Sequence, residues 1–77
     1  MKIPQPLEYL KQRGAAVHAY DDDEGAIVAD FGTSDDGQVD VVGKTAIVLV
    51  GDQQFEFDLP PEANRISINS GILTITE

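Results

Sequence analysis

The sequence predicts an all-β protein, an antiparallel β-sandwich or small barrel, with a short helix before the first strand. Apolar and polar residues alternate with a period of two in short stretches of residues 15–77, which is typical of strands with one buried face. Turn-forming Gly, Pro, Asp and Asn residues separate these stretches at short intervals. Helix formers dominate before them. We therefore divide the chain into a helical segment (1–14) and a β-sandwich domain (15–77).

The helix is predicted over Gln5–Arg13, where good helix formers surround Pro6 and precede Gly14. Proline is tolerated in a first helical turn, and glycine is a common stop after the last one. Leu7 and Leu10 share one face of this helix. A helix of about two turns is not stable alone, so it must dock on its own sandwich or on a partner.

Seven short stretches have the pattern of strands. Phe55–Leu59 shows the clearest alternation, and Pro60 ends it because proline cannot donate a hydrogen bond to a neighbouring strand. Thr45–Val50 is apolar almost throughout, which predicts a strand buried on both faces. The predicted strands are Val17–Tyr20, Ala26–Phe31, Val39–Val42, Thr45–Val50, Phe55–Leu59, Ile66–Asn69 and Ile72–Thr76.

The chain is strongly acidic, with 14 Asp and Glu against five Lys and Arg and a net charge of -9. Three of the five bases, Lys2, Lys11 and Arg13, lie in the first 13 residues, which therefore form a basic segment. The acidic remainder repels phosphates and anionic lipids, so we expect no binding to nucleic acid or membrane. Since hydrophobic residues still make up 42% of the chain, the charge indicates a hydrated surface adapted to high salt rather than disorder. It predicts a halophilic source.

The chain has no cysteine, so neither disulfides nor a thiolate metal cluster can brace the fold. The N-terminal residues lack the apolar core of a signal peptide, and no apolar run reaches the roughly 18 residues of a membrane span. We therefore expect a soluble, cytoplasmic protein. A domain of this size buries only about 60% of the surface that its unfolded chain exposes, so a large substrate cavity is not expected.

Residues with catalytic or metal-binding chemistry are few. His18 is the only histidine, and no nucleophile signature lies near it. Asp21–Glu24 offers carboxylates of the kind that calcium and magnesium prefer, but it lacks the spacing of an EF-hand loop, so a solvated turn is the favoured interpretation. Asp35–Gly37 has the composition of an ordinary turn. We therefore predict a protein that is not an enzyme, with no catalytic residue, metal site or cofactor.

Two segments near the C-terminus carry a family resemblance. Phe55–Pro60 reads Phe-Glu-Phe-Asp-Leu-Pro, and Ile68–Ile75 reads Ile-Asn-Ser-Gly-Ile-Leu-Thr-Ile. Together they resemble the C-terminal part of the α-crystallin domain of small heat-shock proteins, which has an aromatic-rich strand ending in Leu-Pro and a later Asn-Gly turn; here Ser70 stands in place of that Asn. Asp30–Gly32 stands where the family has Asp-Leu-Pro-Gly. The resemblance covers residues 16–76 and implies an immunoglobulin-like sandwich that holds unfolding proteins and assembles into oligomers.

The parts through which that family assembles are missing here. The turn Gly51–Gln54 replaces the long loop through which many members exchange a strand, and the chain stops at Glu77 with no tail for the Ile-x-Ile motif that links dimers. Ile66–Ile68 (Ile-Ser-Ile) matches that motif in letters, but its spacing of two within a predicted strand is explained by core packing. We therefore expect a monomer or a small oligomer.

The resemblance also implies a client-binding groove between the strands Val39–Val42 and Ile66–Asn69. The candidate lining residues are Val39, Val41, Val42, Ile66 and Ile68. Each of them is β-branched, so core packing is the simpler role for each.

The predicted helix has two open roles: its residues Leu7, Tyr9 and Leu10 would either cover this groove or contact a partner. The leading hypothesis is a minimal, non-enzymatic α-crystallin-like module, from a haloarchaeon, that binds protein clients as a weak holdase. The alternative is an adaptor that binds one folded protein partner through its basic N-terminal helix.

Overall fold

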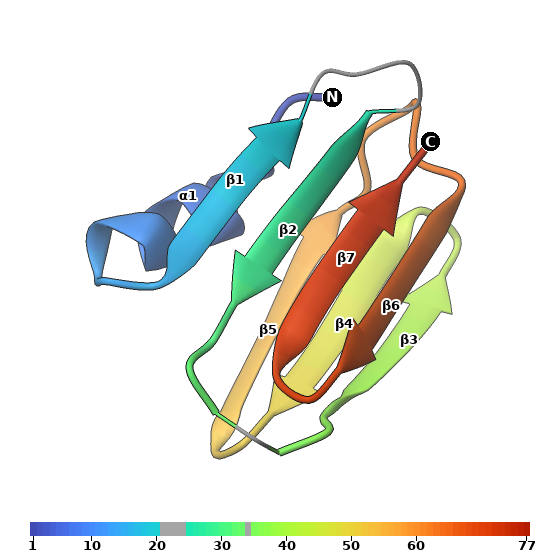
Figure 1. Cartoon of the computed structure of the whole chain (residues 1–77). Helices are drawn as coiled ribbons and strands as arrows, with labels where there is room; N and C mark the ends of the chain where they lie inside the picture. Colours follow the sequence, from blue (N-terminus) through green and yellow to red (C-terminus); the bar gives the residue numbers. More distant parts are fainter. Residues whose placement is uncertain (21–24, 34) are drawn as a thin grey trace.

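The computed structural model describes residues 1–20, 25–33 and 35–77, in which one helix precedes seven strands (Figure 1). One antiparallel sheet has the strand order β1-β2-β7-β6, and the other has the order β3-β4-β5. The two sheets form a small β-sandwich-like fold, which confirms the predicted all-β class with a short N-terminal helix. The elements are α1 (Gln5–Gln12), β1 (Ala16–Tyr20), β2 (Ala26–Asp30), β3 (Gln38–Val42), β4 (Thr45–Val50), β5 (Gln53–Asp58), β6 (Arg65–Asn69) and β7 (Ile72–Thr76).

The strand register places one set of side chains between the sheets. Partners in an antiparallel pair share a face, and successive residues alternate between faces. Val17 is opposite Ala29, which is opposite Leu73, so these three side chains point inward from one sheet. Val48 and Phe55 pair in the same way in the other sheet. The buried apolar core comprises Leu7, Val17, Ile27, Ala29, Ala46, Val48, Val50, Phe57, Leu73 and Ile75.

Helix α1 docks on its own sandwich. Leu7 is fully buried in the same core as the strand residues, and the helix contacts β1 and β5. Arg13 follows the last helical residue, and its backbone N–H donates to the Leu10 carbonyl at 3.0 Å. The short helix therefore owes its stability to packing against the two sheets.

Among the residues that the structure describes, no helix has the length and apolar character needed to cross a membrane.

The prediction that Thr45–Val50 is buried on both faces is wrong. Ala46, Val48 and Val50 are buried on the inner face, whereas Leu49 on the outer face is 41% exposed. The physical reason is that β4 belongs to a two-layer fold. In the described residues, no third layer covers the outer face of the β3-β4-β5 sheet.

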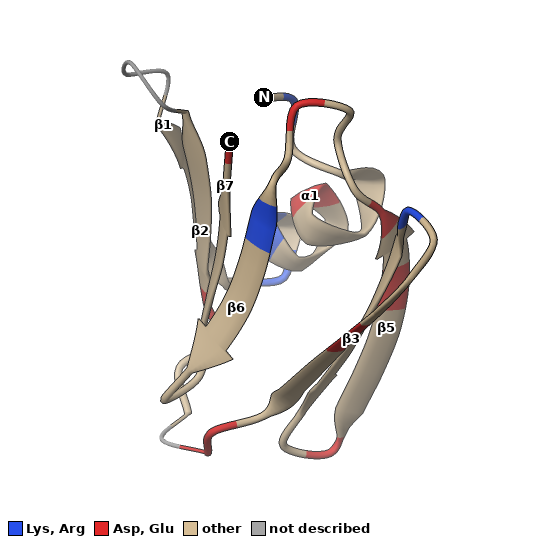
Figure 2. Ribbon diagram, turned by 90° about the vertical axis from the view of Figure 1, so that its right-hand side faces the viewer, with Lys and Arg blue, Asp and Glu red and all other residues tan. Residues whose placement is uncertain are grey.

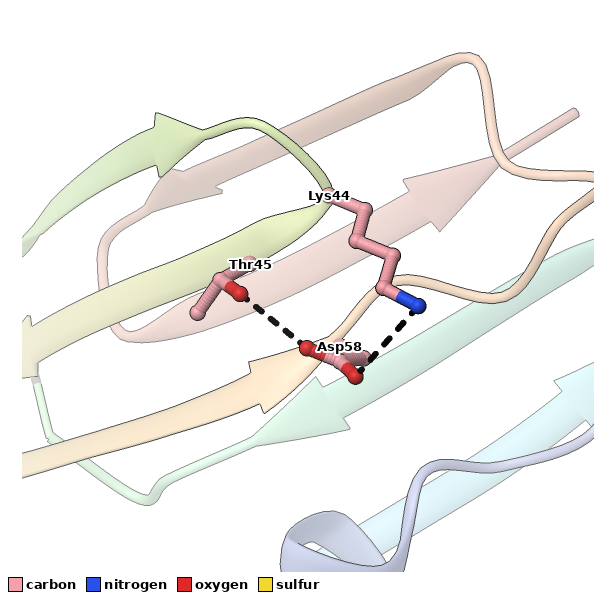
Figure 3. A network of polar contacts seen from close by, with 3 residues as sticks. All are labelled: Lys44, Thr45 and Asp58. Carbon is pink, nitrogen blue, oxygen red and sulfur yellow. Dashed lines mark hydrogen bonds and ion pairs between the residues drawn. The ribbon is translucent and has the colours of Figure 1, made fainter.

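Polar contacts hold the end of the β4–β5 hairpin (Figure 3). The Thr45 hydroxyl donates to Asp58 Oδ1 at 3.0 Å, and Lys44 Nζ lies 3.9 Å from Asp58 Oδ2. The Leu59 N–H donates to the Lys44 carbonyl at 2.7 Å. Because the ion pair is exposed, it adds little stability. These contacts align the last residues of β5 with the first residues of β4.

The β6–β7 turn offers a position for stabilisation. Both turn residues have positive φ, 51° at Ser70 and 76° at Gly71, and two-residue hairpins of this kind favour Asn followed by Gly. We therefore expect Ser70→Asn to raise the free energy of unfolding by about 0.5 to 1 kcal/mol, since Asn tolerates positive φ better than Ser. Urea denaturation followed by circular dichroism measures the change. Ser67→Asn, at an exposed position inside β6, is the control and should give no gain; a lower midpoint for Ser70→Asn contradicts the prediction.

Candidate functional site

Strands β3 and β6 form one edge of the sandwich. Each is the last strand of its sheet, and the two contact each other across the layers. Figure 2 views this edge, with β6 and β3 in front and α1 behind them, between the sheets. In the described residues, no backbone hydrogen bond joins either strand to anything beyond its own sheet neighbour. We call these two strands, Gln38–Val42 and Arg65–Asn69, the open edge.

The open edge brings together three of the predicted groove residues on the inner side. Val39, Ile66 and Ile68 are half-buried and pack against the core. Val39 is opposite Val48, and Ile66 is opposite Ile75, so these side chains point between the sheets. They therefore form an apolar floor behind the open edge, and they also contribute to core packing.

The other two predicted groove residues are exposed and point in opposite directions. Val41 is opposite Ala46 and so belongs to the inner face, yet its side chain is 46% exposed. Val42 is opposite Thr45 on the outer face and is 67% exposed. The prediction that Val42 lines the same groove as Val41 is therefore wrong, because successive residues of a strand point to opposite faces.

Of the two roles left open for the helix, covering this groove does not agree with its position. Helix α1 contacts β1 and β5, at the opposite edge of the sandwich (Figure 1). Both β1 and β5 are end strands of their sheets, on the side opposite β6 and β3. The helix therefore lies away from the open edge.

The predicted helix residues have different environments at that opposite edge. Leu7 is fully buried, Leu10 is half-buried against the core, and Tyr9 is 57% exposed. Leu7 is thus unavailable to a partner. The exposed residues of the helix are Gln5, Tyr9, Lys11 and Gln12, and the exposed Arg13 follows them.

A hollow at the end of α1 was not predicted from the sequence. It lies between the helix, the end of β2 and the start of β5. We call it the helix-end groove; its main lining residues are Leu10, Arg13, Phe31, Gln53 and Phe55. One signal in the sequence was available: Tyr9 and Arg13 are four residues apart, a spacing that places two helix side chains next to each other. The approach of Phe31 to this helix depends on the strand order and carries no local signal.

The residues considered for catalysis or metal binding do not form a centre in the described structure. His18 is exposed on β1, with its ring 6.3 Å from that of Tyr20. The acidic run Asp21–Glu24 lies outside the described residues. Elsewhere along the described ranges, no group of three or more His, Cys, Asp or Glu side chains is close enough to hold a metal ion.

Comparison with known proteins identifies a family without assigning an activity. No curated protein and no solved structure matches the chain. A family model described as a family of unknown function, DUF7127, matches residues 1–77. The match spans α1 and both sheets, and therefore both the open edge and the helix-end groove. The chain belongs to the DUF7127 family.

Proposed function

We propose that this chain is a non-enzymatic protein-binding module of the α-crystallin type, which holds extended apolar segments of unfolding proteins. The observation that carries the proposal is the exposure of two neighbouring valines, Val41 (46%) and Val42 (67%), on the edge strand β3. An edge strand presents N–H and C=O groups to which an extended peptide can add as a further strand. The valines would supply apolar contacts for the side chains of that peptide.

Two further observations support this proposal. The half-buried Val39, Ile66 and Ile68 provide an apolar floor at the same edge, and α1 lies at the other edge and leaves this one accessible. The resemblance of Phe55–Pro60 and Ile68–Ile75 to the α-crystallin domain supports an immunoglobulin-like topology and a holdase role. A module of this kind would work as a monomer or a small oligomer.

The acidic surface suits a salt-rich cytoplasm. At the net charge of -9, repulsion within the chain weakens as salt shortens the Debye length to about 3 Å at 1 M. Apolar contacts at the open edge do not weaken in the same way, since they involve no charge. The proposed function therefore persists at salt concentrations that abolish binding driven by surface charge.

The adaptor remains the alternative. It is favoured by the exposed Lys11 and Arg13 on a chain with only five bases. Because Leu7 is buried in the core, an adaptor contact is confined to the exposed side of α1. Removal of residues 1–13 would also remove Leu7 and is therefore a poor test of this alternative.

Aggregation of a client protein tests the holdase proposal. In about 1 M KCl, where charge effects are screened, molar excess of the protein should suppress the light scattering of insulin reduced with dithiothreitol. The reductant leaves the protein unchanged because the chain has no cysteine. We expect Val41→Lys to weaken client binding about tenfold, or about 1.4 kcal/mol, since a lysine at an edge strand opposes strand addition.

Leu49→Lys is the matched control. Leu49 has a similar exposure (41%) but lies on β4, inside the sheet, where no strand can add. This variant should suppress scattering as the parent protein does. Absence of suppression by the parent protein, or equal losses in both variants, would contradict the proposal.

A further inference from the structure

The helix-end groove consists of two adjacent hollows. Their volumes are about 510 and 400 Å³, and both are lined by Leu10, Arg13 and Gln53. The larger hollow extends towards Phe31 and Gly32 at the end of β2, and the smaller one extends along the exposed side of α1. The groove lies at the α1 side of the sandwich, across the molecule from the open edge.

The groove has an apolar floor. Leu10 is half-buried against the core, and the rings of Phe31 and Phe55 pack with their centroids 5.5 Å apart. The Phe55 ring lies 6.3 Å from that of Phe57, which is buried. This aromatic row anchors the floor in the core, so the floor is present before any ligand binds.

The guanidinium group of Arg13 lines both hollows. Arg13 Nη1 donates to the Tyr9 hydroxyl at 3.0 Å, and the guanidinium carbon lies 5.5 Å from the centroid of the Tyr9 ring. Within the described residues, no carboxylate lies within ion-pair distance of Arg13. The backbone carbonyls of Leu10 and Lys11 already accept hydrogen bonds from residues 13–15. The free guanidinium N–H groups therefore remain able to bind a carboxylate.

The position of the acidic residue Asp30 determines where in the groove a ligand can carry a negative charge. Among the described residues, Arg13 is the only charged one that lines the smaller hollow, whereas Asp30 also lines the larger one. Asp30 Oδ1 accepts a hydrogen bond from the Gly32 N–H at 2.8 Å. A carboxylate is thus favoured in the smaller hollow beside Tyr9, and an uncharged apolar group is favoured over Phe31 and Phe55.

We propose that the helix-end groove binds an extended peptide segment of another protein, in which an acidic side chain is next to large apolar side chains. The carboxylate pairs with the planar donor fork of Arg13, and the apolar side chains pack on Leu10 and Phe55. Charge complementarity selects this partner, because the described residues around this hollow present the positive charge of Arg13 without a carboxylate at ion-pair distance. The groove is open to solvent rather than enclosed, which suits an extended chain better than a small molecule that needs enclosure.

Two labelled peptides test the proposal by fluorescence anisotropy. The probe is acetyl-Ser-Thr-Phe-Glu-Leu-Thr-Ser-amide, and its partner has Gln in place of Glu. In about 0.15 M salt, where the Debye length is about 8 Å, the Glu peptide should bind at least about tenfold more tightly, since charge-assisted hydrogen bonds to Arg13 are lost with Gln. Arg13→Gln should abolish this preference. Arg65→Gln removes an exposed arginine from the open edge and should leave the preference unchanged.

Three outcomes would overturn the proposal: equal binding of the two peptides, a preference that survives in Arg13→Gln, or a preference lost in Arg65→Gln. Circular dichroism of each variant verifies that the fold is intact. Val41→Lys separates this groove from the open edge, because it should leave the affinity for the Glu peptide unchanged. If the parent protein dimerises and Arg13→Gln makes it monomeric in sedimentation, a second copy occupies the groove, which also refutes the proposal.

Discussion

Replacing Leu7 by alanine should lower the free energy of unfolding by about 2 to 5 kcal/mol, the range found for buried leucines. Leu7 is fully buried, and it joins α1 to the core formed by the two sheets. The substitution leaves a cavity where α1 meets β1 and β5, and the eight-residue helix has no stability of its own to retain it there. Because small domains are stable by only about 5 to 15 kcal/mol, a large share of the stability depends on this side chain.

Tyr9→Ala is the matched control for that experiment. It removes a large side chain from the exposed side of the same helix, together with its contact to Arg13. An exposed contact of this kind contributes no more than about 1 kcal/mol. Urea denaturation monitored by far-ultraviolet circular dichroism compares the two variants. Equal destabilisation would mean that Leu7 does not link the helix to the core.

Gly71→Ala should destabilise the protein by about 3 kcal/mol, for two additive reasons. Gly71 has φ of 76°, which costs an L-residue about 1 to 2 kcal/mol. A Cβ added at Gly71 would also collide with the backbone carbonyl oxygen of Thr33, and overpacking adds about 1 to 3 kcal/mol. The turn cannot easily move away, because the Phe31 N–H donates to the Gly71 carbonyl at 2.9 Å.

Gly43→Ala separates the two causes. Gly43 has φ of 63°, but a Cβ there would meet nothing within 4 Å. This variant should therefore lose only the conformational part, about 1 to 2 kcal/mol. The difference between the two variants in urea denaturation measures the steric part at Gly71. If both glycines prove equally tolerant of alanine, the close approach between the β6–β7 turn and Thr33 is not rigid.

The elements of this fold follow from local sequence, and their arrangement does not. All seven strands lie close to the predicted positions, because apolar alternation and turn residues are local properties. The pairing of the strands is not a local property: β2 pairs with β7, more than 40 residues later in the chain. Nothing in Ala26–Asp30 or Ile72–Thr76 specifies the other as its partner. The pairing results from how all the apolar faces are buried together.

The prediction that Thr45–Val50 is buried on both faces failed for the same reason, because burial depends on the arrangement of the whole fold. A continuous apolar run shows that both faces of a strand tolerate apolar residues, but whether the second face is covered depends on the number of layers. In this two-layer fold Val48 is buried and the adjacent Leu49 is 41% exposed. The apolar composition of a strand alone does not show whether its second face is exposed or buried.

The candidate sites were predictable in part. The residues Val39, Ile66 and Ile68 were expected to line one groove; each is half-buried against the core, and their strands β3 and β6 contact each other. The helix-end groove was not expected, because Arg13, Phe31 and Phe55 come from three separate elements. The apolar face of a helix can be read from its periodicity, but the edge that receives this face depends on the linker to β1 and on the strand order.

The position of α1 has a consequence for growth into fibres. Fibre formation by strand stacking requires every added molecule to offer a fresh edge on its far side. Here each sheet has one edge at the helix, β1 or β5, and one edge on the opposite side, β6 or β3. Two copies that met through their β3 or β6 strands would present to a third the side of the sandwich against which α1 packs. The eight residues of α1 thus place a helix beside the two end strands to which a growing fibre would have to add.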